Sequence, residues 1–157
     1  MPQGGFSVEG GLDASGLRFA VAVARFNAQV TGKLYDGCQE ELLGRGAAAD
    51  DVETVEAPGC FELPLIAKAL ASTGRFDAVI CLGAVIRGET AHFDYIASAA
   101  MSGVARIGLE TGVPAIFGVL TTDTVEQALA RSGAKGSNRG YDAAVAGVRR
   151  SNGDALH

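Results

Sequence analysis

Imidazole and thiol side chains are scarce in this sequence. His92 and His157 are the only histidines, which excludes a metal site built from several imidazoles and leaves a single general base as the more specific use of a histidine. The cysteines Cys38, Cys60 and Cys81 are odd in number and form no C-x-x-C motif. Because the chain also shows no signal-peptide pattern, we expect reduced thiols in a cytoplasmic protein.

Clustered positive charge and long apolar runs are also lacking. The formal net charge is −5 and the isoelectric point is about 5.0, which argues against a general nucleic-acid-binding or membrane-binding surface. No apolar run reaches the ~18 residues that a membrane-spanning helix requires, because glycine and charged residues interrupt every stretch. We therefore expect any bound anion to be held by a local site.

Glycine, by contrast, is abundant. Its 22 residues are about twice the usual ~7% share, so tight turns and close approaches of the backbone are expected. The 157 residues suffice for one domain with a buried core but hardly for two. We predict a flexible N-terminal segment over 1–16, with a strand that could pair with a neighbouring subunit, and a single domain over 17–157.

Apolar runs alternate with helical patterns along the chain. Runs typical of strands buried in a parallel sheet lie at 17–24, 52–56, 78–85 and 115–120. Helical spacing or helix-start signals follow them at 34–42, 63–70, 93–107, 123–131 and 138–150, with Asp123 and Glu126 as the expected start of the fourth helix. This alternation predicts an α/β fold, a flavodoxin-like three-layer sandwich with a central four-stranded parallel sheet.

The connections after the first two strands contain three candidate site residues. Ligands of an open parallel sheet bind beyond the carboxyl ends of its strands. Phe26 either presents its ring to a planar heterocycle or caps the core. Glu62 either favours the dipole of a helix or accepts hydrogen bonds from a polyol. No histidine lies beside Cys60 in the sequence, so we interpret it as an inert apolar side chain rather than a nucleophile.

The third connection has the densest set of polar groups. Gly88 permits a tight turn, and the backbone amides of Glu89 and Thr90 precede a long helix whose N-terminus can bind a phosphate. His92 follows in the first helical turn, where the positive end of the helix dipole favours the neutral imidazole. Such an imidazole can accept a proton near pH 7, although a lone histidine in a loop is usually structural or solvated.

The fourth connection leads to two cations. Arg131 can make bidentate hydrogen bonds to a phosphate, and Lys135 adds a point charge. Taken alone, both are interpreted as solvated cations that favour a helix C-terminus. Their importance depends on convergence with the groups of the third connection.

Taken in order and with their spacing, four segments resemble the lumazine synthase family along nearly the whole chain. The matching segments are 25–27, 58–64, 83–95 and, with Val125 left out, 118–128. The resemblance implies a transferase of riboflavin biosynthesis, which condenses 5-amino-6-(D-ribitylamino)uracil with 3,4-dihydroxy-2-butanone 4-phosphate. The products would be 6,7-dimethyl-8-ribityllumazine, phosphate and water. No metal or redox cofactor is implied.

The resemblance also implies roles for individual residues. His92 would relay protons during imine formation, phosphate elimination and ring closure. The ribitylaminouracil would contact Phe26, Cys60, Phe61, Glu62, Ala84, Val85, Ile86 and Phe117. The phosphate would contact the amides of Glu89 and Thr90 together with Arg131 and Lys135. Phe117 and Arg131 would approach the site from the adjacent subunit of a homopentamer.

Some features depart from the family pattern or leave alternatives open. The Glu89 carboxylate would repel a phosphate unless it points outward, and Cys60 replaces smaller or hydroxylated residues. The 133–140 connection is similar to that of members that form a 60-subunit shell, except for Ser137 in place of a glycine. A flavin-binding or nucleotide-binding module of the same fold is one alternative, although no G-x-G-x-x-G follows the first strand. A structural cage subunit is the other.

Overall fold

The computed structural model of the chain describes residues 11–88 and 91–153. Within these residues, four parallel strands form one sheet in the order β2-β1-β3-β4. The strands are β1 (Phe19–Ala24), β2 (Val52–Ala57), β3 (Ala78–Ile86) and β4 (Ala115–Thr122). The central pair, β1 and β3, is buried on both faces apart from the last residue of β3, which explains why these strands are continuous apolar runs in the sequence.

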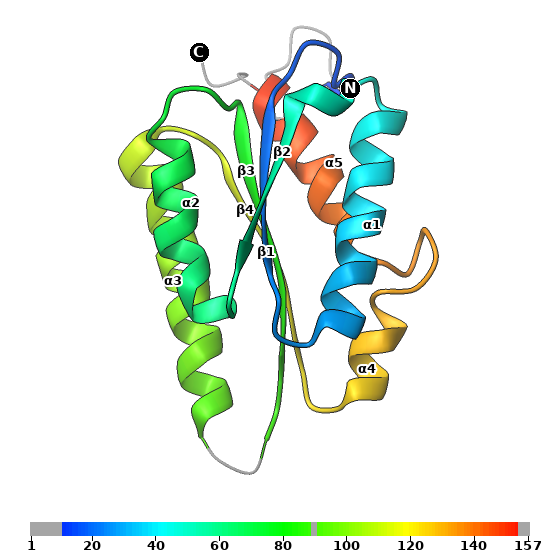
Figure 1. The fold of residues 1–157 in the computed structure, drawn as a ribbon, viewed down its shortest axis with the longest axis vertical. Coiled ribbons are helices and arrows are strands. Elements are labelled where there is room, and N and C mark those ends of the chain that lie inside the picture. Colours follow the sequence, from blue (N-terminus) through cyan, green and yellow to red (C-terminus); the bar gives the residue numbers. More distant parts are fainter. Residues whose placement is uncertain (1–10, 89–90, 154–157) are drawn as a thin grey trace, which may run out of the picture.

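Helices cover both faces of the sheet (Figure 1). α1 (Ala28–Gly44) and α5 (Arg139–Asn152) lie on one face, and α2 (Leu63–Ala71) and α3 (His92–Thr111) lie on the other. The short α4 (Val125–Ala130) and two 3-10 turns, η1 (Ala49–Asp51) and η2 (Cys60–Glu62), lie in the connections. Each face has its own apolar cluster, so the predicted α/β three-layer fold is confirmed.

A close helix crossing fixes the start of α5. A Cβ added at Gly140 would lie 2.0 Å from the carbonyl oxygen of Leu34, so the α5 backbone can approach α1 this closely only with glycine there. Asn138 caps α5, since its side-chain oxygen accepts a hydrogen bond from the Gly140 amide at 2.7 Å. Its side-chain nitrogen donates to the Lys33 carbonyl on α1 at 3.1 Å. The connection before α5 is therefore held against α1.

The start of the fourth helix differs by one residue from the prediction. Thr124, not Asp123, is the N-cap of α4, and its hydroxyl accepts a hydrogen bond from the Gln127 amide at 3.1 Å. The Gln127 side chain in turn accepts from the Asp123 and Thr124 amides. The Asp123 carboxylate is instead bound to Arg87, 2.8 Å from its Nε, so a contact between distant residues displaces the expected cap.

The described part of the N-terminal segment is attached to the domain. The Ala14 amide donates to the Arg45 carbonyl at 2.9 Å, and the Asn152 side chain donates to the carbonyls of Gly11 and Asp13. Ala14 is fully buried. Residues 1–10, which include the expected N-terminal strand, lie outside the described residues, so its pairing with a neighbouring subunit stays a prediction.

Candidate active site

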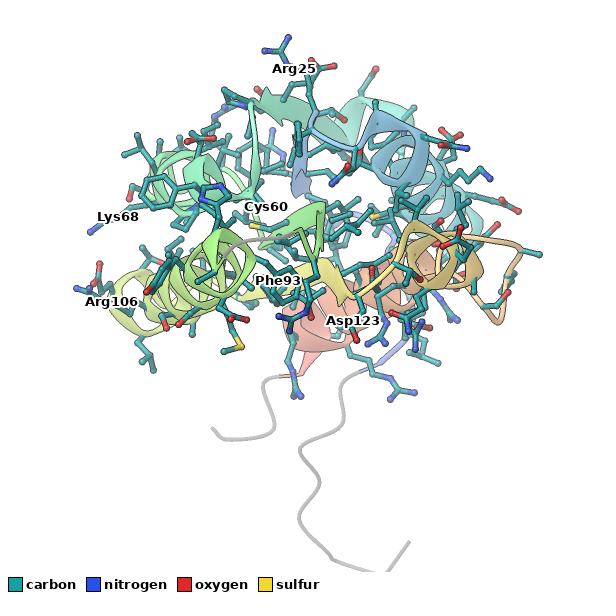
Figure 2. All side chains as sticks on the ribbon, turned by 90° about the horizontal axis from the view of Figure 1, so that it is seen from below. Arg25, Cys60, Lys68, Phe93, Arg106 and Asp123 are labelled. Atoms are coloured by element: carbon teal, nitrogen blue, oxygen red, sulfur yellow. The ribbon has the colours of Figure 1, made fainter. Side chains whose placement is uncertain are left out.

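A cavity of about 170 Å³ lies at the carboxyl ends of β1 and β3. Most of its lining is apolar, with one imidazole and one amide side chain among the groups that face it. The lining residues are Phe26, Asn27, Cys60, Ala84, Val85, Ile86, Gly88, His92, Phe93 and Ile96. Figure 2 views the molecule from this end and shows Cys60 and Phe93 near the middle of the rim. Six of the predicted site residues therefore share one cavity.

The connection after β1 presents an exposed aromatic ring. Phe26 is 72% exposed, so the interpretation that its ring caps the core is wrong. Asn27 follows in the left-handed region at φ 67°, and its side-chain nitrogen donates to the Ala84 carbonyl at 3.0 Å. The Phe26 amide donates to the Pro58 carbonyl at 3.1 Å. These two hydrogen bonds tie the connection to its neighbours and hold Phe26 at the mouth of the cavity.

The connection after β2 places a thiol in the cavity wall and a carboxylate beside it. Cys60 is buried, and this burial raises the pKa of its thiol to about 11, so it is protonated near neutral pH. A carboxylate oxygen of Glu62 accepts a hydrogen bond from the Gly59 amide at 3.0 Å. Phe61 is exposed, and neither it nor Glu62 is among the lining residues of this cavity.

The connection from β3 to α3 supplies the histidine. Ala84 and Val85 are buried at the end of β3, and both line the cavity. His92 is the first residue of α3 and also faces the cavity. Glu89 and Thr90, the predicted phosphate-binding pair, lie outside the described residues. In the sequence, the groups expected to bind the uracil ring and to relay protons flank the segment expected to bind phosphate.

Three other predicted residues lie away from this cavity in the protomer. Phe117, in the middle of β4, packs half-buried against the cluster under α2 and α3. Arg131 follows α4, and its Nη1 donates to the Gln127 carbonyl at 3.1 Å. Lys135 pairs with Glu41, with 3.1 Å between Nζ and Oε1. A single protomer therefore does not bring these groups to His92.

Arg131 shares a second depression with a cation that the sequence analysis did not single out. The Arg139 amide donates to the Arg131 carbonyl at 2.8 Å, and the bridge between Ser132 and Asn138 puts the two arginines directly opposite one another. Both line a depression of about 390 Å³. In the described part of the chain neither guanidinium takes part in an ion pair, and the carboxylate of Asp142 lines the same depression.

Sequence reasoning also missed part of the cavity wall. Asn27 could have been suspected, because asparagine is the residue after glycine that best tolerates the left-handed region. Phe93 and Ile96 were assigned to the buried stripe of their helix, where they do pack, and the same side chains also line the cavity. A helical stripe at the end of a sheet can serve both purposes, which spacing alone does not reveal.

Residues 11–88 and 91–153 contain neither a candidate metal-binding cluster nor a candidate membrane-spanning helix. No group of three or more His, Cys, Asp or Glu side chains in these ranges could hold a metal ion. No helix in them is long and apolar enough to cross a membrane.

Comparison with known proteins gives the family. The family described as 6,7-dimethyl-8-ribityllumazine synthase matches residues 16–152. A curated relative from Desulfotalea psychrophila (strain LSv54 / DSM 12343), named 6,7-dimethyl-8-ribityllumazine synthase, is 52% identical over 145 residues, which cover 92% of this chain and 94% of the relative. The resemblance found in the sequence is thereby confirmed, and the chain belongs to the 6,7-dimethyl-8-ribityllumazine synthase family.

Proposed function

We propose that this enzyme condenses 5-amino-6-(D-ribitylamino)uracil with 3,4-dihydroxy-2-butanone 4-phosphate to 6,7-dimethyl-8-ribityllumazine, phosphate and water in riboflavin biosynthesis. The observation that carries the proposal is that Phe26, His92 and residues 84–86 line one cavity in a chain of this family. The substrate amine is itself the nucleophile of this reaction. The protein therefore has to orient two reactants and move protons.

The uracil ring is proposed to stack on Phe26 and to bind the main chain of Ala84, Val85 and Ile86. An aromatic ring at the cavity mouth suits a planar heterocycle. The ribityl chain would extend towards 60–62, where Cys60 offers an uncharged wall and Glu62 has a second carboxylate oxygen for a hydroxyl. The protonated thiol of Cys60 does not need to react, because the chemistry requires no protein nucleophile.

His92 is proposed to be the catalytic residue. Formation of the imine needs a proton removed from the attacking amine and one delivered to the departing water. Phosphate elimination and ring closure need further transfers at neighbouring atoms. An imidazole that lines the proposed ring-binding cavity can exchange these protons within one site.

The phosphate is proposed to bind to the backbone amides of Glu89 and Thr90 and to Arg131, with help from Lys135. Arg131 and Phe117 would then come from an adjacent subunit. Two observations support an interface site. The cavity of about 170 Å³ is smaller than the roughly 300 Å³ or more of typical ligand pockets, which supports its completion by a second subunit. Large apolar side chains are also exposed on α2 and α3, among them Leu65, Met101 and Leu109.

The proposed assembly is a homopentamer, and light scattering distinguishes it from a 60-subunit shell. The activity is tested by mixing the two substrates with the purified protein and following the absorbance of the lumazine product. Turnover that requires both substrates supports the proposal. Retention of a flavin without turnover would favour the binding module instead, and large particles without turnover would favour the structural cage subunit.

A further inference from the structure

Arg87 joins three elements at the rim of the sheet. Its amide, directly after β3, donates to the Thr122 carbonyl at the end of β4 at 2.8 Å. Its guanidinium lies 2.8 Å from an Asp123 oxygen through Nε and 3.8 Å from an Asp94 oxygen through Nη2. The guanidinium carbon is also 4.6 Å from the centroid of the Phe93 ring. One side chain therefore contacts the start of α3 and the end of β4.

These contacts do not serve mainly to stabilise the fold. The Arg87 side chain is 48% exposed and both carboxylates are more than half exposed, and ion pairs of this kind contribute little to stability. The function of these contacts follows from their geometry and not from the energy that they contribute. A guanidinium that lies over a ring while its Nε faces a carboxylate restrains the position of that ring.

The Phe93 ring that Arg87 contacts is part of the wall of the proposed active-site cavity. Phe93 lines the cavity and follows His92 directly in the first turn of α3. Asp94, the other α3 contact of Arg87, is the next residue. The backbone of Arg87 anchors one end of the connection to α3, and its side chain anchors the other end. Figure 2 shows Phe93 and Asp123 close together at this rim, in agreement with their shared contact to Arg87.

We propose that Arg87 is a positioning residue that holds Phe93 and the first turn of α3 so that the His92 imidazole faces the reacting atoms. It acts through Phe93 and Asp94, and its own side chain is committed to Asp123. This inference rests on the proposed function, because it assigns Arg87 a part in the proton transfers of His92. A misplacement of a catalytic group by about 1 Å can cost on the order of 100-fold in rate.

The test compares Arg87→Met with the unsubstituted enzyme. We expect kcat to fall about 10-fold to 100-fold, with a much smaller change in KM for the ribitylaminouracil. The midpoint of thermal unfolding should move by no more than about 4 °C, since only exposed pairs are lost. Arg87→Lys should recover only part of the loss, because an ammonium group cannot stack flat on Phe93 while it pairs with Asp123.

A double substitution separates positioning of His92 from a merely structural role. If Arg87 acts through His92, Arg87→Met should slow the His92→Ala enzyme by much less than it slows the unsubstituted enzyme. Equal slowing in both backgrounds would overturn the inference. So would an unchanged kcat for Arg87→Met. If Arg87→Met does not fold, Asp123→Ala replaces it, because this substitution removes the carboxylate that pairs with Arg87 Nε. Asp123→Ala is also expected to lower kcat. An unchanged kcat for Asp123→Ala would overturn the inference.

Arg106→Met is the matched control. Arg106 lies on α3 as well and makes an exposed ion pair with Glu110 at 3.1 Å, and Figure 2 shows it pointing outward, away from Phe93 and Asp123. We expect its kcat to equal that of the unsubstituted enzyme; a loss as large as that of Arg87→Met would refute a specific role for Arg87. If the unsubstituted protein shows no turnover with both substrates, the proposed function fails, whereas turnover that Arg87→Met leaves intact refutes this inference alone.

Discussion

Lys135 and Glu41 form an ion pair in which only the cation faces solvent. Lys135 Nζ is 3.1 Å from Glu41 Oε1, and the carboxylate side chain is only 5% exposed, whereas that of the lysine is 69% exposed. Arg45, the residue directly after α1, pairs with the other oxygen of Glu41. The connection that begins with Arg131 is thus fastened to α1 by the lysine that the sequence analysis assigned to the phosphate.

The stability of the protein should depend on Glu41 in a pH-dependent way. Burial raises the pKa of this carboxyl group, but the hydrogen bonds from Lys135 and Arg45 outweigh burial and lower it below its usual 4.5. A carboxyl group with a lowered pKa stabilises the fold above its unfolded-state pKa and loses that contribution as the pH falls through its folded-state pKa. We predict that Glu41→Gln destabilises the protein by about 2 kcal/mol at pH 7, because a buried charged pair is lost.

The measurement is urea unfolding of both proteins between pH 7 and pH 3. The difference in unfolding free energy between them should shrink as the pH falls below about 4.5, the unperturbed pKa of glutamate. A difference that stays constant over this range would mean that the charge of Glu41 contributes nothing.

Arg131 and Lys135 should differ in their effect on substrate binding. We predict that Arg131→Ala raises KM for the sugar phosphate about 10-fold to 100-fold, the cost of one charge-assisted hydrogen bond. Lys135→Met should raise it less, because its ammonium group already pairs with Glu41. Steady-state kinetics with saturating ribitylaminouracil measures both values.

Arg149→Ala, in the last turn of α5 and exposed, is the control for loss of positive charge. An unchanged KM for Arg131→Ala would remove Arg131 from the phosphate site. A rise for Lys135→Met as large as that for Arg131→Ala would show that the lysine binds the phosphate directly.

His92→Ala should separate catalysis from binding. We predict a fall in kcat of about 100-fold to 10,000-fold, the usual contribution of a general acid or base, with binding of the ribitylaminouracil largely intact. Binding should persist because the proposed ring contacts come from Phe26 and residues 84–86, which line the cavity beside His92. Stopped-flow turnover and equilibrium binding measure the two quantities. Equal losses in both would speak against a proton relay by His92.

The fold was predictable where burial is continuous. The central strands are apolar on both faces, so the prediction for 78–85 differs from β3 by a single residue. The first strand was predicted to begin at Leu17, but the ladder begins at Phe19, because the Arg18 amide donates to the Asp77 carboxylate instead. Contacts between distant residues of this kind leave no periodic signal in the sequence, and the displaced cap of α4 has the same cause.

The site was predictable where it depends on topology alone. The carboxyl ends of parallel strands meet at one rim, so Phe26, Cys60 and His92 could be expected to converge. The partner of Lys135 could not be expected, because the burial of Glu41 results from the packing of the α4–α5 connection on α1. Spacing likewise gave no indication that Arg139 lies opposite Arg131, which depends on the closure of that connection.

Gly83 provides a last test, because it lies against the side chain of Cys60, a lining residue of the cavity. A Cβ added at Gly83 would lie 2.5 Å from the Cys60 sulfur and 3.3 Å from the Ala24 Cβ, so Gly83→Ala must displace the thiol, which belongs to a lining residue of the cavity. We predict a destabilisation of about 1–3 kcal/mol, typical of an overpacked core, and a higher KM for the ribitylaminouracil. Cys60→Ala alone should keep kcat, because a thiol with a pKa of about 11 is a poor nucleophile.

The double variant decides between a local clash and a general loss of packing. If the added methyl group collides with the sulfur, Cys60→Ala should restore most of the stability and KM lost in Gly83→Ala, so the two effects will not add. Additive effects would mean that the clash is with the Ala24 side of Gly83 instead. Loss of turnover in Cys60→Ala with unchanged stability would have a different meaning: the thiol would then take part in the chemistry, and a proton relay by His92 alone would not suffice.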